Sequence, residues 1–536
     1  MTTAIELLRQ GRTEELWQKY CSFIDLSLEE FMEIQKRLLM EQIDLLSKCE
    51  LGCKLLGDKV PTSVEEFRQV VPLTIYEDYK PYLPEKREDA LPVKPLFWAH
   101  TTGRSGEYEF KWVPVPEGVL QTWVKSSLSA LVFSSCHNRG DIALREHDKF
   151  LYSMAPPPYI SGIIPHGLSK EFPFDFLPPL DEAGITSFHE RLEKGFQLAF
   201  REGLDFFGGV TSVLVSIGER FARRTGGMKA SREFLHPKSL FRVTRGLIRS
   251  KVTKRPMLPK DLWTVKGILA SGTDTGIFKE KVKHYWGRYP LEIYAGTEFN
   301  MIAMQTWDYE GLTFIHDGNF LEFVPEEEHI RLKLDSTYQP RTLLLSELES
   351  GEKYEIVVTN FKGGAFVRYR PGDLIKIIAP RNEKLNIDIP QMVFESRVDD
   401  VINLAGFARL TEKIIWRAID EAGIGYEEWT VKKDIRDQQP ALHLYIELKE
   451  EEDRDEKEME EAIHEKLKSL DPFYDDLEKM LGLEPIWVTI LPSGSFRRYI
   501  AEKMAAGAEL AQLKPPHINP SDEIIGKLLR SGEADT

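Results

Sequence analysis

The sequence has little cysteine, no long apolar run and no general excess of positive charge. Four cysteines in 536 residues are too few for a disulfide scaffold and fit a reducing compartment. No apolar run reaches the roughly 18 residues of a membrane-spanning helix. The N-terminus, MTTAIELLRQGRTEELWQKY, is amphipathic and carries acids, unlike a signal peptide. These absences predict a soluble, cytoplasmic protein with no transmembrane segment.

The charge balance limits the partners. A formal net charge of −16 disfavours general attraction to nucleic acid, so we expect no nucleic-acid partner. With 42% hydrophobic residues, a chain of this length can bury the large cores of an enzyme-sized globular protein.

One stretch departs from this acidic composition. Residues 221–260 hold twelve Lys and Arg against the single acid Glu233. The stretch fits a solvated helical face. It also fits a site for the phosphates of coenzyme A, or a contact with a membrane surface or another anionic partner.

The hydrophobic pattern up to about residue 395 predicts an α/β body with a mixed sheet. Residues 1–56 have apolar positions at helical spacing, and the proline- and tyrosine-rich stretch VPLTIYEDYKPYLP (71–84) reads as an extended connection. Short β-rich segments then alternate with helical ones. These segments are KFLYSMAPP, TSVLVSI, YPLEIYAG, LTFIHDGNFLEFVP and KYEIVVTNF.

Beyond residue 400 the pattern changes to that of a small α+β domain. ALHLYIEL (441–448) alternates apolar and polar residues, which predicts a strand with one buried face. MEEAIHEKLKSL has helical spacing behind an acidic start, and EPIWVTILP supplies another strand. We therefore expect a large N-terminal domain at 1–398, with a helical lead-in at 1–70, and a small C-terminal domain at 399–536.

The stretch HTTGRSGEYEFKW (100–112) has the chemistry of a phosphate-binding loop. Its hydroxyls can donate hydrogen bonds, and its glycines let backbone N–H groups approach an anion. Arg104 and Lys111 add positive charge. The loop lacks the Gly-Lys-Ser/Thr ending of a P-loop NTPase, and an ordinary Gly/Ser turn is the alternative. The candidate phosphate-binding residues are Thr101, Thr102, Gly103, Arg104, Ser105 and Gly106.

Four later stretches strengthen the nucleotide interpretation. In YAGTE (294–298), Thr297 could meet a phosphate and Glu298 could bind Mg²⁺. In YRPGD (369–373), Asp373 could accept both hydroxyls of a ribose. SRVDDVINLAGFARL (396–410) begins with Arg397, which could bond ribose or phosphate, and its adjacent acids suggest a hinge. LPSGSFRRYI and AQLKPPHI place Arg497, Arg498 and Lys514 on loops near the C-terminus.

The order of these motifs resembles the adenylate-forming superfamily of acyl-CoA synthetases, peptide-synthetase adenylation domains and luciferases, over about residues 70–515. Within that span VPLTIYEDYKPYL, AGTE, YRPGD and LAQLKPPHI look like the auxin-responsive acyl-acid amido synthetase family, which joins carboxylic acids to amino acids.

The resemblance implies a two-step reaction with ATP and Mg²⁺. A carboxylate would attack the α-phosphate of ATP to give acyl-adenylate and pyrophosphate, and a nucleophile would then displace AMP. The loop at Thr101 to Gly106 would hold the β- and γ-phosphates, and Asp399 or Asp400 would be the pivot of a mobile C-terminal domain. The remaining implied roles are Gly296 and Thr297 at the α-phosphate, Glu298 on Mg²⁺, Asp373 and Arg397 on the ribose, and Gly272 and Thr273, in LASGTDTG, on the adenine.

Two features depart from the superfamily pattern. The loop is longer than usual, which leaves open whether Lys111 reaches phosphate. PSGSFRRY lacks the lysine that superfamily synthetases carry in a Ser-Gly-Lys context, so either an arginine such as Arg498 substitutes or Lys514 acts as the catalytic cation. Three hypotheses remain: an amido synthetase, an acyl-CoA or aryl-CoA ligase with coenzyme A as co-substrate, and a non-catalytic nucleotide-binding relative.

Overall fold

The computed structural model describes most of the chain. The described residues are 2–101, 111–153, 155–182, 188–223, 236–271, 275–334, 338–397, 401–404, 408–436, 439–471, 474–475, 486–505 and 517–530. The chain divides into two compact units. The large unit comprises nearly all residues up to Phe394, and the C-terminal unit is mainly Glu395–Thr536.

The large unit opens with helices, as the apolar spacing predicts. The longest of these helices, α3, has a local reason to start where it does. Ser27 caps α3 and forms a reciprocal capping box with Glu30, which satisfies two backbone donors. The helices of this segment are α1 (Ala4–Arg9), α2 (Thr13–Tyr20), α3 (Leu28–Leu46), α4 (Glu50–Leu56) and α5 (Val64–Val70). Two short 3₁₀ turns follow at Tyr76–Tyr79 and Glu88–Ala90. The prediction of an extended connection over 71–84 is therefore wrong at Tyr76–Tyr79.

The centre of the large unit is an eleven-stranded mixed sheet with the order β10-β11-β12-β13-β9-β8-β7-β6-β5-β3-β4. Neighbours from β7 to β4 pair in parallel, whereas β7–β8, β8–β9, β9–β13 and β10–β11 pair antiparallel. The strands are β3 (Lys149–Ser153), β4 (Asp175–Leu177), β5 (Phe206–Val210), β6 (Gly267–Ser271), β7 (Leu291–Gly296), β8 (Asn300–Met304), β9 (Leu312–Phe314), β10 (Asn319–Pro325), β11 (Lys353–Asn360), β12 (Asp373–Ala379) and β13 (Gln391–Arg397).

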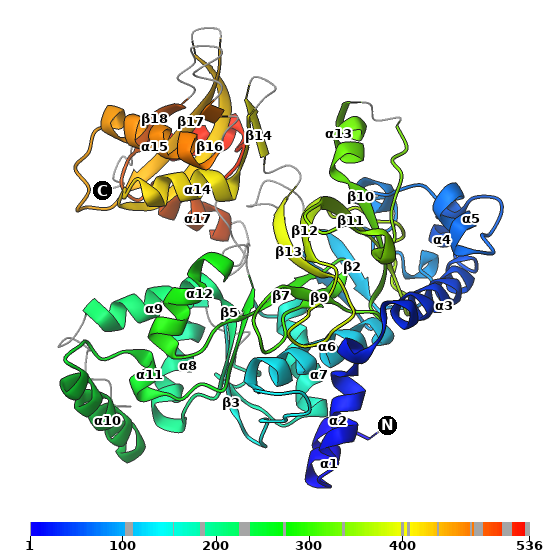
Figure 1. The fold of residues 1–536 in the computed structure, drawn as a ribbon, viewed down its shortest axis with the longest axis horizontal. Coiled ribbons are helices and arrows are strands. Elements are labelled where there is room, and N and C mark those ends of the chain that lie inside the picture. The colour runs from blue at the N-terminus through cyan, green and yellow to red at the C-terminus, as the bar shows by residue number, and fades with distance from the viewer. Residues whose placement is uncertain are drawn as a thin grey trace. The chain divides into compact units, whose positions relative to one another are not determined.

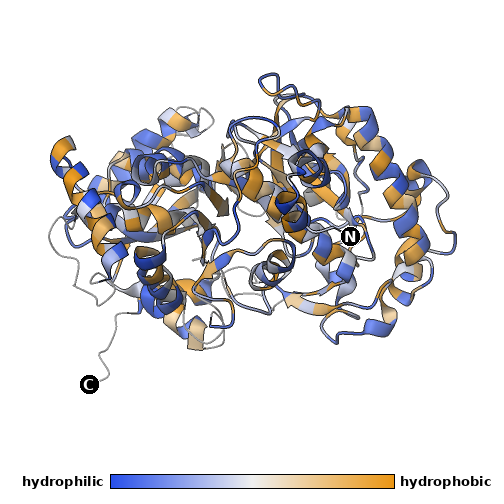
Figure 2. Cartoon of the chain, turned by 90° about the horizontal axis from the view of Figure 1, so that it is seen from below, coloured by the Kyte–Doolittle hydropathy of each residue, from blue (hydrophilic) through white to orange (hydrophobic). Residues whose placement is uncertain are grey.

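Helices cover both faces of the parallel strands (Figure 1). Consecutive residues of β5 point to opposite faces: Phe206 packs in the core that contains α6 and α7, and Phe207 packs in the core that contains α8, α9 and α12. The helices are α6 (Glu117–Ser135), α7 (Ile160–Glu171), α8 (Phe188–Glu202), α9 (Thr211–Arg223), α10 (Pro237–Thr253), α11 (Pro259–Leu262), α12 (Thr275–Trp286) and α13 (Glu326–Leu334). The strands are mostly hydrophobic, while the outer helices carry hydrophilic and hydrophobic bands (Figure 2).

One predicted strand of this region is wrong. TSVLVSI (211–217) reads as a strand because of its β-branched residues, but it begins helix α9. Strands β5 and β6 are parallel neighbours, and such strands must be joined by a crossover, normally a helix. The need for a crossover between β5 and β6 therefore overrides the local β preference of these residues. Leu214 lies in this helix and is buried.

The C-terminal unit has its own cores around a three-stranded sheet of order β16-β17-β18, with a separate β14–β15 pair. The strands are β14 (Val401–Leu404), β15 (Ala408–Thr411), β16 (Tyr426–Arg436), β17 (Gln439–Leu448) and β18 (Ile486–Leu491). The helices are α14 (Glu412–Glu421), α15 (Glu456–Leu470), α17 (Ser495–Ala505) and α18 (Asp522–Leu529). The predicted fold class, a large mixed-sheet α/β body with a small α+β domain, is confirmed.

The alternation in ALHLYIEL predicts a strand with one buried face, and the structure shows that both faces are buried. Leu442, Leu444 and Ile446 are buried, but so are His443 and Tyr445 on the other face of β17. Tyr445 packs in a second core with residues of α17 and α18. Both faces of β17 are therefore covered.

Candidate active site

The predicted phosphate-binding loop joins two strands of a hairpin. β1 (Phe97–His100) and β2 (Trp112–Val115) pair antiparallel, with His100 opposite Trp112. The N–H of Thr101 donates to the carbonyl of Lys111 at 3.0 Å, which closes the base of the loop. Thr102, Gly103, Arg104, Ser105 and Gly106 lie outside the described residues, as do Gly272 and Thr273.

Lys111 brings three of the sequence motifs together. Its Nζ lies 3.3 Å from Oε1 of Glu298 and donates to the hydroxyl of Tyr369 at 3.0 Å. The Tyr369 hydroxyl also donates to Oε1 of Glu298 at 3.4 Å. The lysine of the loop, the acid of YAGTE and the tyrosine of YRPGD thus form one polar triangle. Glu298 is mostly buried in it, with 13% of its side chain exposed.

The turn between β7 and β8 fixes the position of Thr297 and Glu298. Gly296 ends β7, and a Cβ there would lie 2.4 Å from the ring of Phe299, so no side chain fits. Asn300 begins β8 with a φ of 64°, in the left-handed region that asparagine tolerates. This tight turn presents two adjacent functional groups at a strand end.

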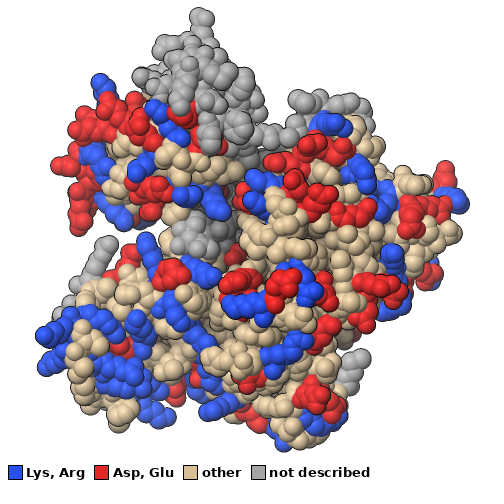
Figure 3. Space-filling view, in the orientation of Figure 1, with Lys and Arg blue, Asp and Glu red and all other residues tan. Residues whose placement is uncertain are grey.

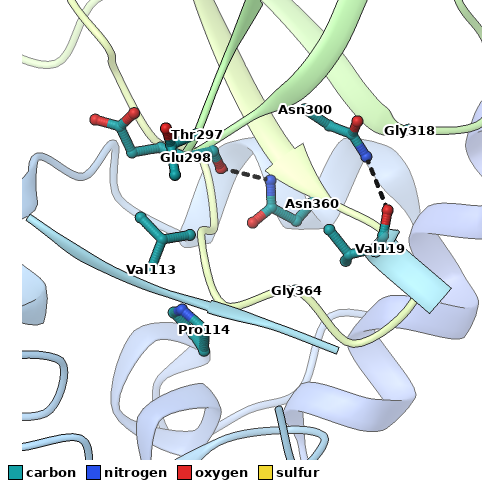
Figure 4. A pocket seen from close by; sticks show the side chains of 9 residues that line it. All are labelled: Val113, Pro114, Val119, Thr297, Glu298, Asn300, Gly318, Asn360 and Gly364. Atoms are coloured by element: carbon teal, nitrogen blue, oxygen red, sulfur yellow. Dashed lines mark hydrogen bonds between the residues drawn. The ribbon is translucent and has the colours of Figure 1, made fainter. Parts of the chain in front are cut away.

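Thr297 and Glu298 line a pocket (Figure 4). The side-chain amide of Asn360 donates to the backbone carbonyl of Glu298 at 3.1 Å, and that of Asn300 donates to the carbonyl of Val119 at 3.4 Å. The pocket is lined by Val113, Pro114, Val119, Thr297, Glu298, Asn300, Gly318, Asn360 and Gly364.

Buried amides hold the pocket walls. Asn360 also donates to Oδ1 of Asn319 at 2.9 Å and accepts from the N–H of Phe366. From α3, Gln35 donates to the carbonyl of Asn319 at 2.7 Å, and Gln42 donates to the carbonyl of Gly364 at 2.9 Å. Four neutral amides thus connect helix α3 to the segments that carry the pocket.

The two ribose candidates lie at the ends of two strands. Asp373 is buried at the start of β12, and Arg397 ends β13, where its side chain is outside the described set. The motif's Arg370 bonds the carboxylate of Glu355, with its closest contact at 2.8 Å. Arg370 therefore has a structural partner, and Asp373 is left as the ribose candidate within YRPGD.

The two C-terminal cation candidates differ. Arg497 and Arg498 lie in helix α17, so the prediction of a loop at these two positions is wrong. Arg498 donates to the Ser493 carbonyl, the Ser495 hydroxyl and the Arg530 carbonyl, all within the C-terminal unit. Lys514 and the hinge candidates Asp399 and Asp400 fall outside the described residues. The guanidinium of Arg498 is thus already engaged in fixing its own helix.

An ion-pair cluster anchors the chain just after Lys514. His517 donates through Nδ1 to Glu412 at 2.6 Å and through Nε2 to Glu428 at 2.8 Å, and it stacks on Trp429 with ring centroids 4.5 Å apart. Burial alone would lower its pKa, but the two carboxylates outweigh burial and raise the pKa of His517 to about 10. His517 is therefore protonated at neutral pH.

Sequence reasoning missed several groups of this site. Tyr369 stands in the quoted YRPGD motif, yet no spacing rule indicates that its hydroxyl meets Lys111. Asn319 and Asn360 sit at strand ends with no motif around them. Of the described residues, none form a group of three or more His, Cys, Asp or Glu able to hold a metal ion by themselves.

Family models and known proteins match large parts of the chain. The N-terminal, central and C-terminal domain models of the GH3 family match residues 21–154, 312–397 and 411–523, which together make up more than half of the chain. A jasmonoyl–L-amino acid synthetase of Oryza sativa subsp. japonica is 25% identical over 287 residues, 49% of this chain and 47% of that relative. An indole-3-acetic acid-amido synthetase of Arabidopsis thaliana is 23% identical over 268 residues, 46% of this chain and 44% of that relative.

Solved structures share the fold over nearly the whole chain. An acyl acid amido synthetase in complex with 2,4-DB superposes with a TM-score of 0.66 at 17% identity, covering 97% of this chain and 95% of that one. A 2-hydroxyisobutyryl-CoA ligase in its postadenylation state gives a TM-score of 0.55 at 13% identity, covering 98% and 92%. The matches to the curated relatives span about half of their length. Because the three domain models of the GH3 family together match more than half of the chain, the chain belongs to the GH3 family.

Proposed function

We propose that this protein is an ATP-dependent, AMP-forming ligase that activates a carboxylic acid as an acyl-adenylate and transfers the acyl group to an amino acid. The observation that carries the proposal is the triangle of Lys111, Glu298 and Tyr369, which joins three of the sequence motifs. Of the three residues, Glu298 lines the pocket. The curated relatives named above are acyl–amino acid synthetases, and this supports an amine as the acceptor.

In the first step an oxygen of the substrate carboxylate attacks the α-phosphorus of ATP. A new P–O bond forms, and the bond to the bridging oxygen breaks with that electron pair leaving on pyrophosphate. The loop from Thr101 to Gly106 would hold the leaving phosphates through backbone and hydroxyl donors. Thr297 would donate to the α-phosphate, Asp373 and Arg397 would bind the ribose, and Gly272 and Thr273 would lie against the adenine.

Glu298 fits a role on Mg²⁺. One of its oxygens faces Lys111 and Tyr369, and Mg²⁺ is commonly bound by one or two carboxylates together with substrate phosphates. Bound there, Mg²⁺ would supply neutralisation of phosphate charge. The protein's own part is to hold the carboxylate in place through the Asn360 bond to the Glu298 backbone.

In the second step the amine nitrogen attacks the acyl carbon and AMP leaves with the carbon–oxygen electron pair. The amine loses a proton to the solvent as the amide forms. We assign the cation near the reacting phosphate to Lys514, because the Arg498 guanidinium is bonded within its own unit. Asp399 or Asp400 would be the pivot between a domain at 1–398 and one at 399–536 in the two half-reactions.

The cell compartment is inferred from cysteine chemistry. The four cysteines, Cys21, Cys49, Cys53 and Cys136, are all free thiols, which suits a reducing cytoplasm. The described part of the chain contains no helix both long and apolar enough to cross a membrane.

The acceptor is tested by product identification. Purified protein is incubated with Mg·ATP and a panel of aromatic, fatty and small carboxylic acids, and each acid is supplied with mixed amino acids or with coenzyme A. We expect an N-acyl amino acid by mass spectrometry together with AMP. An acyl-CoA product would replace the amido synthetase by a CoA ligase, and ATP binding without product from any acid would favour a non-catalytic relative.

A further inference from the structure

Helix α10 exposes an unusual apolar face. Leu240, Phe241, Leu247, Ile248 and Val252 are 58%, 69%, 50%, 58% and 76% exposed, respectively. Spacings of one, four and seven residues among them put them on one side of the helix. Scattered exposed apolar side chains are ordinary, but a contiguous stripe usually marks a binding surface.

Cations accompany this stripe, and residues 236–260 contain no acid except Asp261 just beyond them. Lys251 lies within the apolar side, four residues after Leu247 and three after Ile248. Lys238, Arg249, Lys251 and Lys254 are exposed, and none of them has a carboxylate within 4.0 Å among the residues that the structure describes. Figure 3 shows blue Lys and Arg atoms gathered at the lower left, where Figure 1 places α10. The helix is therefore a basic, apolar surface on a chain with a net charge of −16.

The opposite side of α10 is fixed to the large unit. Ser239 and Gly246 are buried, and a Cβ at Gly246 would lie 2.8 Å from the sulfur of Met257. Arg242 donates to the carbonyls of Phe200 and Arg201 at 2.7 and 2.8 Å. These contacts fix the orientation of the helix about its own axis, so the apolar stripe on the other side faces the solvent.

We propose that α10 is a docking helix that holds the protein against an anionic phospholipid surface. A helix with an apolar face flanked by Lys and Arg lies in the plane of a membrane interface, with its apolar side chains among the acyl chains and its cations at the lipid phosphates. A second copy of this helix is a poorer occupant, because it would bring cations against cations. Coenzyme A has phosphates for the cations but no large apolar surface for the stripe.

The test is vesicle sedimentation of the full chain, which needs no turnover and is therefore independent of the proposed reaction. We expect the protein to sediment at least tenfold more strongly with phosphatidylcholine vesicles containing phosphatidylglycerol than with pure phosphatidylcholine, and less strongly at high salt. The double variant Phe241→Ser/Ile248→Ser and the double variant Lys251→Glu/Lys254→Glu should each lose at least tenfold. Leu96→Ser, at a residue 61% exposed elsewhere in the large unit, is the matched control and should bind as wild type.

Three results would overturn the proposal. The first is no sedimentation of folded wild type with anionic vesicles at low salt, and the second is binding that neither double variant weakens. The third is a wild-type dimer by light scattering that both variants convert to a monomer, since the stripe would then cover a second copy. Circular dichroism checks that the variants are folded.

Discussion

The two units fix their functional segments by different chemistry. In the large unit, neutral amides from Gln35, Gln42, Asn319 and Asn360 bond the backbone around the pocket. In the C-terminal unit, the chain after Lys514 is fixed by an imidazolium between Glu412 and Glu428. The amide network has no titrating member, whereas the His517 cluster changes charge with pH. The comparison predicts that the pocket keeps its geometry over a wide pH range and that the C-terminal anchor does not.

The largest expected effect separates the two C-terminal cations. Lys514→Ala should lower acid-dependent pyrophosphate release by about 10²- to 10³-fold, the usual cost of losing a cation or donor preorganised for the transition state. Arg498→Ala should lower it less, because Arg498 bonds within its own unit. Equal rates for the two variants and wild type would contradict the assignment of Lys514 as the catalytic cation.

The next effect tests the triangle in the large unit. Lys111→Met removes the charge that meets Glu298 and Tyr369, and it should lower kcat/KM for ATP by about 10- to 100-fold, as expected for a hydrogen bond to a charged group. Steady-state kinetics measure this. Lys94→Met, at an exposed lysine, is the matched control, and a Lys111 variant no worse than that control would remove Lys111 from the site.

A smaller effect concerns the stability of the pocket wall. Asn360→Leu leaves the Glu298 carbonyl, Asn319 Oδ1 and the Phe366 N–H without their partner and should lower the free energy of unfolding by about 1–3 kcal/mol. Urea denaturation should give the same loss at pH 6 and pH 9, because no group of the network titrates. Asn138→Leu, at an exposed asparagine, should cost far less; a strongly pH-dependent loss at Asn360 would contradict the neutral-network account.

The smallest effect follows from the raised pKa of His517. A group whose pKa is higher in the folded state stabilises fully below its unfolded value, near 6.5, and that stabilisation is lost as pH rises through about 10. The Tm difference between wild type and His517→Gln should therefore be largest near pH 6 and shrink toward pH 10. At pH 6 we expect the substitution to lower the free energy of unfolding by about 1 kcal/mol, because 23% of the His517 side chain is exposed to solvent, which weakens its ion pairs. A pH-independent difference between the two proteins would show that His517 acts by packing alone.

The sequence could predict elements whose signal is local. The helical lead-in, the motif order and the strand at 441–448 are all readable from periodicity and spacing. The helix at TSVLVSI was not, because the parallel pairing of β5 and β6 demands a crossover that only the sheet order reveals. The second buried face of β17 could not be predicted either, because the helices that pack on it, α17 and α18, come later in the chain.

In the candidate site, too, local sequence signals could be read in advance and long-range contacts could not. Glu298, Thr297 and Asp373 stand in recognisable motifs, so their residue types could be named in advance. The contact of Lys111 with Glu298 and Tyr369 joins positions 187 and 258 residues apart, and no spacing rule reaches that far. The buried glutamines of α3 look like ordinary polar positions in an amphipathic helix until the loops that they bond are known.

The adenylation half-reaction is tested most directly by acid-dependent exchange of labelled pyrophosphate into ATP, measured with no acceptor present. The account predicts exchange that depends on both the carboxylic acid and Mg²⁺ for wild type, and a loss of at least tenfold in Glu298→Gln, which keeps the shape of the side chain but removes its charge. Folded wild type that binds ATP yet shows no exchange with any acid, or a Glu298→Gln variant that exchanges as fast as wild type, would contradict it.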